Sequence, residues 1–257
     1  MSPSTSIGSS LLQAFRQIGL VFVVAVGAAT VFTMWSPSSL LPSNVAGAIS
    51  IALATQESQA NGGATAVLPT ETPTPRPIIG IVAGHSGPQN DPGAVCPDGL
   101  TEASINLEVA NRVKAILEQA GYRVDLLSEF DDRLTGYKAL ALVSIHADSC
   151  AFINEQATGY KVARALYDQV PEKSDRLVAC LTDRYTDRTG MSFHSGSITV
   201  DMTQYHGFNE IDANTPGAII ELGFLNLDRN MLTSHPDLLA QGVAEGVLCY
   251  ARNEPVP

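Results

Sequence analysis

Three apolar runs along the chain each end in a residue that can bind a metal ion or transfer a proton. The runs and the residues that follow them are 78–83 with His85, 139–145 with His146, and 218–220 with Glu221. Short continuous apolar runs of this kind are typical of strands that are buried on both faces of a parallel sheet. The pattern therefore predicts three buried strands, each with a chemically active side chain at its carboxyl end.

Helical patterns separate these strands. From Glu102 to Leu117, apolar residues recur on one helical face, and Gly121 then supplies a C-cap. Residues 122–127 follow as another strand, which completes a β-loop-α-β unit of the kind that builds parallel sheets. The remaining predicted elements are a short strand at 159–162 and helices at 174–186 and 236–252.

This alternation predicts an α/β fold, with a twisted, mostly parallel open sheet flanked by helices on both faces. We expect a single domain over residues 78–252, followed by a short tail at 253–257, and we expect it to be a monomer. The formal net charge is -11 and the isoelectric point about 4.8. A chain this acidic lacks the basic face that binds a phosphate backbone, so nucleic acid is excluded as the expected partner.

The N-terminal part of the chain has a different composition. Residues 18–35 form an uncharged apolar run close to the roughly 20 residues that a membrane-spanning helix needs. Arg16 is the one charged side chain before it, which favours a cytoplasmic tail at 1–17 and an extracytoplasmic location for the remainder. A cleaved signal peptide, and hence a secreted protein, is the alternative. Residues 36–77 are rich in Pro, Thr and Ala and are predicted to form an extended linker.

The chemistry of the predicted site follows from the topology. In a parallel sheet, groups at the carboxyl ends of the strands meet in one crevice, and Glu102 opens the helix that begins at the same edge. Two imidazoles and a carboxylate hold zinc and leave a position for water, so we expect His85, Glu102 and His146 to be zinc ligands. Glu221 is then free to act as the base that completes deprotonation of the water. Taken singly, each residue has a structural alternative as a hydrogen-bonding group in a loop.

Other residues near this edge have open roles. His194 and His206 lie in the irregular segment 191–214, and either could hydrogen-bond to the substrate or to a developing oxyanion. A structural or solvent-exposed role is the alternative for both. Asp148 follows His146 by two residues and could orient that imidazole or cap the backbone.

Four cysteines follow the apolar N-terminal run, and none forms a CxxC pair. They allow three disulfide pairings. Cys96 and Cys150 each lie shortly beyond a proposed metal ligand, which favours a bond between them and leaves Cys180 with Cys249. The alternative is that some of them are small buried residues without a bond.

The motifs, taken in order, resemble those of a known enzyme family. They are Gly84-His85, Asp91-Pro92-Gly93-Ala94, Glu102, Ser144-Ile145-His146-Ala147-Asp148 and Glu221-Leu222-Gly223-Phe224. Over about residues 78–252 the chain resembles the zinc-dependent N-acetylmuramoyl-L-alanine amidases of the amidase-3 family. The resemblance implies zinc at the three residues named above, Glu221 as the catalytic glutamate, and hydrolysis of the amide that joins muramic acid to L-alanine in peptidoglycan.

The chain also departs from the family pattern. The loop at 86–99 has inserted residues, and the segment at 128–138 is much shorter than the arginine-containing stretch that the family usually has there. Two alternative functions are a noncatalytic module that binds or regulates peptidoglycan, and a zinc peptidase that cuts the stem peptide. The presence of all four site residues favours an enzyme.

Overall fold

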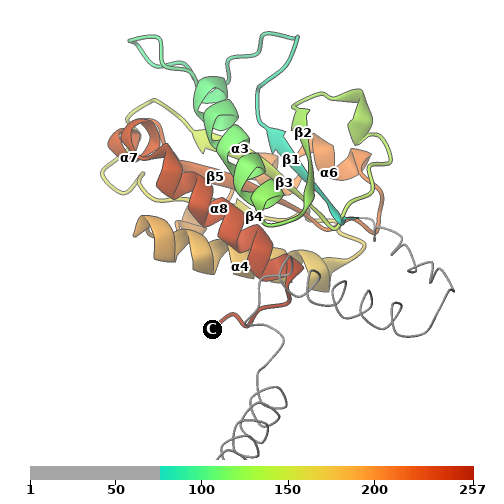
Figure 1. Cartoon of the computed structure of the whole chain (residues 1–257). Helices are drawn as coiled ribbons and strands as arrows, with labels where there is room; N and C mark the ends of the chain where they lie inside the picture. Colours follow the sequence, from blue (N-terminus) through green and yellow to red (C-terminus); the bar gives the residue numbers. More distant parts are fainter. Residues whose placement is uncertain (1–75) are drawn as a thin grey trace, which may run out of the picture. The chain divides into compact units, whose positions relative to one another are not determined.

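Five strands form one sheet in the order β2-β1-β3-β5-β4. They are β1 (Ile78–Ala83), β2 (Arg123–Ser128), β3 (Ala141–Asp148), β4 (Lys161–Ala163) and β5 (Gly217–Phe224). Adjacent strands are parallel except β4, which runs antiparallel to β5 at the edge. The structure is a computed structural model that describes residues 76–257, and it confirms the predicted mostly parallel α/β sheet (Figure 1).

Three long helices cover one face of the sheet. They are α3 (Glu102–Gln119), α4 (Pro171–Thr189) and α8 (Pro236–Ala251), with α8 packed between the other two (Figure 1). Alternate residues of the central strands point toward these helices and are buried with them, because successive strand residues face opposite sides of a sheet. This cluster is the main hydrophobic core.

Short elements cover the other face. They are 3-10 turns at Asp132–Leu134 and Ser195–Ser197, and the helices α5 (Val200–Thr203) and α6 (His206–Glu210). Leu134 packs on Val82 and Leu142, while Met202 and Tyr205 pack on Ile219. Another short helix, α7 (Arg229–Ser234), precedes α8. None of these short helices was predicted, since one or two turns are too few to show a helical repeat.

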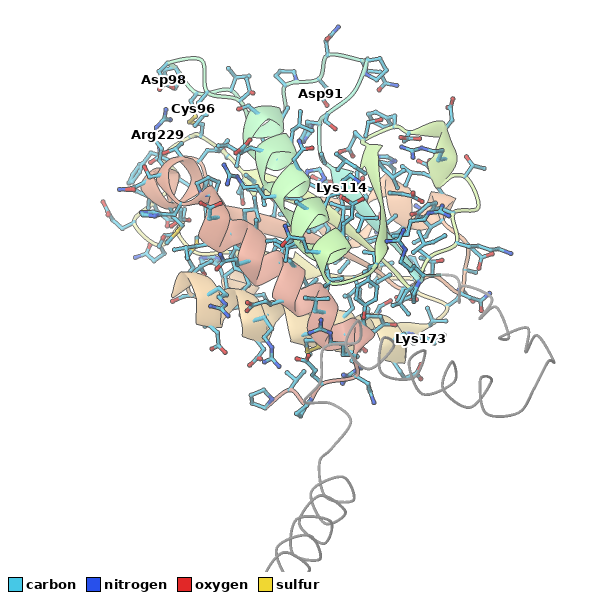
Figure 2. All side chains as sticks on the ribbon, in the orientation of Figure 1. Asp91, Cys96, Asp98, Lys114, Lys173 and Arg229 are labelled. Carbon is cyan, nitrogen blue, oxygen red and sulfur yellow. A yellow bond between two sulfur atoms is a disulfide. The ribbon has the colours of Figure 1, made fainter. Side chains whose placement is uncertain are left out.

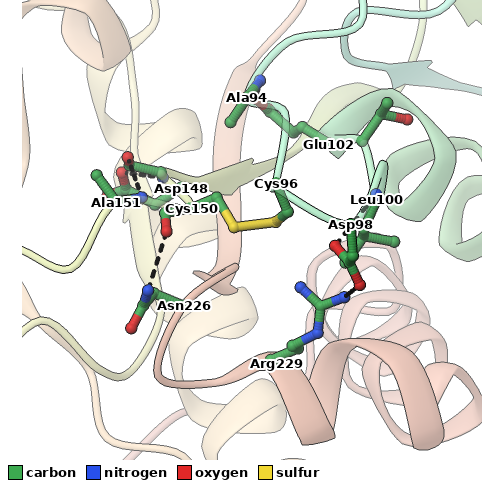
Figure 3. Close-up of a disulfide and its surroundings, with 12 residues drawn as sticks. Ala94, Cys96, Asp98, Leu100, Glu102, Asp148, Cys150, Ala151, Asn226 and Arg229 are labelled. Carbon is green, nitrogen blue, oxygen red and sulfur yellow. Dashed lines mark hydrogen bonds and ion pairs between the residues drawn. A yellow bond between two sulfur atoms is a disulfide. The ribbon is translucent and has the colours of Figure 1, made fainter.

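Both predicted disulfides are present. Cys180 on α4 is bonded to Cys249 on α8, and Cys96 in the loop before α3 is bonded to Cys150 just after β3 (Figure 3). Figure 2 shows Asp98 beside Cys96 and next to Arg229, the first residue of α7, with which it forms an ion pair. The loop before α3 is thus tied both to the segment after β3 and to α7.

The predicted N-terminal tail, the apolar segment at 18–35 and nearly all of the linker at 36–77 lie outside the described residues. Within residues 76–257, the structure contains no helix with both the length and the apolar character needed to cross a membrane.

Candidate metal centre and active site

The register of three neighbouring strands brings charged side chains into one row. His146 on β3 lies opposite Glu221 on β5, and Glu221 lies opposite Lys161 on β4. The adjacent residues in each strand belong to the core beneath the long helices, so these three side chains point to the face with the short helices. This row borders a cavity of about 620 Å³, which is lined by residues of both the sheet edge and the short helices.

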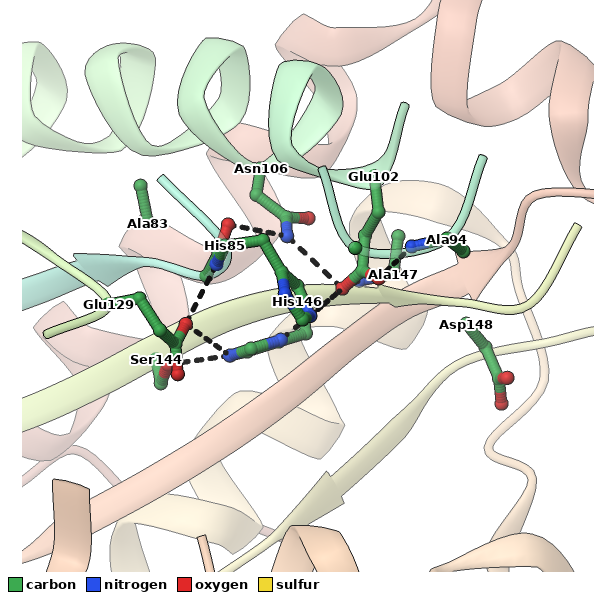
Figure 4. Close-up of polar contacts among 12 residues, drawn as sticks. Ala83, His85, Ala94, Glu102, Asn106, Glu129, Ser144, His146, Ala147 and Asp148 are labelled. Atoms are coloured by element: carbon green, nitrogen blue, oxygen red, sulfur yellow. Dashed lines mark hydrogen bonds and ion pairs between the residues drawn. The ribbon is translucent and has the colours of Figure 1, made fainter. Parts of the chain in front are cut away.

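His85 directly follows Gly84 at the end of β1 and has an unusual backbone conformation. Its φ angle of 58° lies in the left-handed region, which costs a non-glycine residue on the order of 1–3 kcal/mol. Its backbone N–H donates to Oε2 of Glu129 at 2.8 Å (Figure 4). Its ring Nδ1 lies 2.8 Å from Oδ2 of Asp91. These contacts leave Nε2 of the ring facing Glu102.

Glu102 is the first residue of α3, and its side chain is almost completely buried. Its Oε1 atom accepts hydrogen bonds from the Asn106 side chain at 3.3 Å and the Ala147 backbone at 3.2 Å, and Oε2 accepts one from the Ala94 backbone at 3.1 Å. Burial raises the pKa of this carboxyl, but contact with His146 and the bond from Ala94 outweigh it and lower the pKa overall. The group is therefore an ionised carboxylate.

The three predicted ligand residues lie together. Oε1 of Glu102 is 3.4 Å from Nε2 of His85 and 3.3 Å from Nδ1 of His146, and one donor atom from each residue lies within 4.8 Å of the others. Ligands about 2.1 Å from a tetrahedral zinc ion are about 3.4 Å apart, so this donor set fits zinc. The second nitrogen of each imidazole is also held, by Asp91 for His85 and by the Ser144 hydroxyl for His146, as in established metal sites.

Two glycines make room for this cluster. A Cβ atom on Gly84 would lie 2.4 to 2.6 Å from three atoms of the His146 ring. A Cβ atom on Gly93, whose φ angle is 63°, would lie 2.6 Å from Oε2 of Glu102. The positions of both side chains thus depend on the absence of a side chain at the neighbouring glycine.

Glu221 lies beside the cluster without belonging to it. Its Oε2 atom is buried and, within residues 76–257, has no hydrogen-bond partner. Burial raises the pKa of this carboxyl to about 7, with partial compensation by the positive charges of His146 and Lys161. A carboxyl with such a pKa can accept a proton and return it near neutral pH.

The raised pKa of Glu221 predicts that wild type and Glu221→Gln differ in stability by an amount that depends on pH when no metal is bound. Between pH 4.5 and about 7 the unfolded chain releases the Glu221 proton while the folded chain keeps it, so rising pH destabilises the fold. Moving the pKa from 4.5 to about 7 corresponds to about 3 kcal/mol at most. We therefore expect Glu221→Gln, which stays neutral, to gain stability relative to wild type by up to that amount from pH 4 to pH 8. Urea unfolding in a chelator measures this change, and a stability difference that does not increase with pH would contradict it.

Glu129 is a site residue that sequence reasoning missed. Its side chain is almost completely buried, and its carboxylate contacts the His85 backbone, His206 and His146. Burial raises its pKa, but the bond from His206 and the neighbouring His146 outweigh it and lower the pKa to about 2. Glu129 directly follows β2, so the rule that located His85 and His146 at strand ends also applies to it. The polar composition of residues 128–138, which is typical of a connecting loop, concealed it.

The structure gives each of the other candidate residues a different set of contacts. Both ring nitrogens of His206 contact carboxylates, Glu129 and Glu210, at 2.7 Å each, so neither is free for a substrate. His194 bonds to Ser197 and is not among the described residues that line the cavity. Asp148 lines the cavity but pairs with Lys161 rather than with His146.

The two disulfides allow a matched prediction about the metal centre. Cys96–Cys150 links the loops that follow His85 and His146, whereas Cys180–Cys249 links two helices. With sequence separations of 54 and 69 residues, replacing either pair by serine is expected to cost roughly 4 kcal/mol of unfolding free energy. Only the first replacement should also weaken metal binding, which competition between the protein and a chromophoric chelator for added zinc measures. Equal zinc affinities in the two double variants would contradict this expectation.

Comparisons with known proteins point to one enzyme family. Residues 79–249 match the amidase-3 family, which is described as N-acetylmuramoyl-L-alanine amidase. A stretch of 93 residues is 36% identical to the N-acetylmuramoyl-L-alanine amidase AmiC of Neisseria meningitidis, and it covers 33% of this chain and 22% of that protein. The matched stretch thus spans about a fifth of the length of this curated relative.

Solved structures show the same fold. The amidase AmiC2 of Nostoc punctiforme is 23% identical with a TM-score of 0.54, and the match covers 68% of this chain and 97% of that one. The amidase Ami1 of Mycobacterium smegmatis is 17% identical with a TM-score of 0.55, covering 70% and 98%. The CwlD amidase of Clostridioides difficile, solved with the GerS lipoprotein, is 21% identical with a TM-score of 0.51, covering 69% and 100%.

Proposed function

Because the chain belongs to the amidase-3 family of N-acetylmuramoyl-L-alanine amidases, we propose that it hydrolyses the amide between N-acetylmuramic acid and the L-alanine of the stem peptide. One observation carries the proposal within this chain. A His-Glu-His cluster borders the same cavity as a buried carboxyl oxygen that has no hydrogen-bond partner among residues 76–257. This arrangement combines a metal-binding donor set with a proton acceptor, which are the two parts of metal-assisted amide hydrolysis.

We propose that the metal is zinc and that His85, Glu102 and His146 hold it. Two imidazole nitrogens and one carboxylate oxygen suit zinc better than magnesium or calcium, which prefer oxygen ligands. When bound, zinc supplies Lewis acidity that activates water and polarises the scissile carbonyl group. Asp91 and Ser144 orient the two imidazoles through the nitrogen that faces away from Glu102.

Glu221 is proposed to move the proton. Its Oε2 atom takes a proton from the attacking water, whose oxygen bonds to the carbonyl carbon of the lactyl group. The carboxyl then gives that proton to the alanine nitrogen as the C–N bond breaks. The products are a free lactyl carboxylate and a peptide with an amine on L-alanine. Burial of the Glu221 carboxyl favours its protonated form, which is the form that donates to the nitrogen.

Product mapping of peptidoglycan digested by the full chain tests this function. We expect stem peptides with a new free amine on L-alanine and glycan strands whose muramic acid residues have free lactyl carboxylates, and we expect a chelator to stop the release of both. Cleavage further along the stem would instead indicate a peptidase. Retention of the protein on the wall without any release would indicate a noncatalytic binding module.

The proposed substrate lies outside the cytoplasm. We propose that residues 18–35 anchor the chain in the membrane, with 36–77 as the linker to an extracytoplasmic catalytic domain at 78–252 that acts as a monomer. The uncharged apolar run in the sequence supports this arrangement. Membrane fractionation of the full chain tests it, since a cleaved signal peptide would release the protein into the medium.

A further inference from the structure

Glu129 is bonded to the turn that contains the first proposed ligand. Its backbone N–H donates to the carbonyl oxygen of Ser86 at 3.0 Å, and its Oε2 atom accepts from the backbone N–H of His85 at 2.8 Å (Figure 4). The two bonds run in opposite directions across the ends of β1 and β2. They hold His85 in its left-handed conformation and so direct its ring toward Glu102.

The same carboxylate oxygen also faces the other histidine. Oε2 of Glu129 lies 3.5 Å from Nε2 of His146, on the side of the ring opposite Nδ1, which faces Glu102 (Figure 4). The Ser144 hydroxyl lies 3.1 Å from the same nitrogen. Glu129 therefore contacts both proposed imidazole ligands, whereas Asp91 contacts one of the two, His85, and is about half exposed.

The second oxygen of Glu129 fixes the carboxylate itself. Oε1 lies 2.7 Å from Nε2 of His206, and Nδ1 of that ring lies 2.7 Å from Glu210. The Phe130 ring stacks on His206 with 4.6 Å between the ring centroids. The carboxylate is thus held at both oxygens and shielded from water, with only 7% of the Glu129 side chain exposed.

We propose that Glu129 is a positioning residue that sets the geometry of both histidines toward the metal. This inference rests on the proposed function, since it assumes that His85 and His146 are metal ligands. Partners of this kind commonly change metal affinity by 10- to 100-fold when they are replaced. Glu129 acts from the β2 side of the cluster, away from β5 and Glu221.

The test compares Glu129→Gln with Glu210→Gln in the full chain. The amide that replaces the Glu129 carboxylate has one acceptor oxygen and cannot accept from both His85 and His206, so zinc affinity should fall by about 10- to 100-fold, as measured by chelator competition. The visible absorption spectrum of the Co²⁺-substituted protein should also change, because the donor geometry changes. Glu210→Gln removes a carboxylate from the same chain of contacts without touching either ligand, and it should keep both properties within about threefold of wild type.

Wild-type zinc affinity and an unchanged cobalt spectrum in folded Glu129→Gln would overturn the proposal. If that variant does not fold, Glu129→Asp replaces it, since a side chain one methylene shorter cannot reach both His85 and His206; wild-type zinc affinity in it would overturn the proposal equally. Neither readout requires substrate. If the wild-type chain binds zinc but releases no peptides with an L-alanine amine, the proposed function is refuted and this inference stands. If the wild-type chain is active and the Glu129 variants bind zinc as it does, the proposed function stands and this inference is refuted.

Discussion

Glu221→Gln is expected to lower the kcat for release of L-alanine amines from peptidoglycan by about 10²- to 10⁴-fold, the usual contribution of a general acid-base group. Glutamine has nearly the same shape but cannot accept the proton of the attacking water. Zinc affinity should stay within a few-fold of wild type, because Glu221 is not one of the three clustered donors. Rates and zinc affinity are measured on the same preparation.

The matched control is Glu108→Gln, which makes the same chemical change on the exposed side of α3. Its activity should equal that of wild type. A fully active Glu221→Gln protein would refute the proposed role of Glu221, and a loss of zinc in that variant would mean that Glu221 acts on the metal site instead.

Gly84→Ala is expected to weaken zinc binding by about 100-fold, the upper end of the range for a disturbed ligand position, and to lower activity at limiting zinc. The new methyl group would lie 2.4 to 2.6 Å from three atoms of the His146 ring. That ring is held by Ser144 and contacts the Tyr205 ring edge to face, so it can make room only by moving its Nδ1 atom away from Glu102. Chelator competition gives the affinity, and excess zinc should partly restore the rate.

Two reference variants give the lower and upper limits of zinc affinity for this comparison. His146→Ala removes the ligand itself and sets the affinity expected for complete loss. Gly196→Ala adds a methyl group that meets no non-neighbouring atom of the described residues within 4 Å, so this variant should bind zinc as wild type does. An affinity for Gly84→Ala that matches Gly196→Ala would show that the ring tolerates the methyl group.

The parts of the fold that carry the strand-end residues could be predicted because their signals are local. The run before His85 is apolar over six residues, and the helix after it repeats its apolar positions over five turns. Parallel topology then places the strand ends at one edge without knowledge of side-chain contacts. The cysteine pairing also followed, since the two loops that contain Cys96 and Cys150 begin at that edge.

The remaining features depend on contacts that no local pattern contains. Glu129 and His206 are 77 residues apart in the chain, and only the packing of α6 beside the end of β2 brings them together. The short strand predicted at 159–162 is present as β4, but its antiparallel direction, which places Lys161 opposite Glu221, depends on its pairing with β5. Gly84 has the sequence signature of a simple strand terminator, and its role becomes clear only from the position of the His146 ring.

The order of the sheet has a consequence for the synthesis of the protein. The clustered donors come from the ends of β1 and β3 and from the start of α3, whereas Glu221 comes from β5, about 75 residues later in the chain. In the proposed assignment, a polypeptide that stops before residue 221 contains every zinc ligand but lacks the base. Incomplete translation products would therefore carry the metal-binding residues without the ability to cut the cell wall.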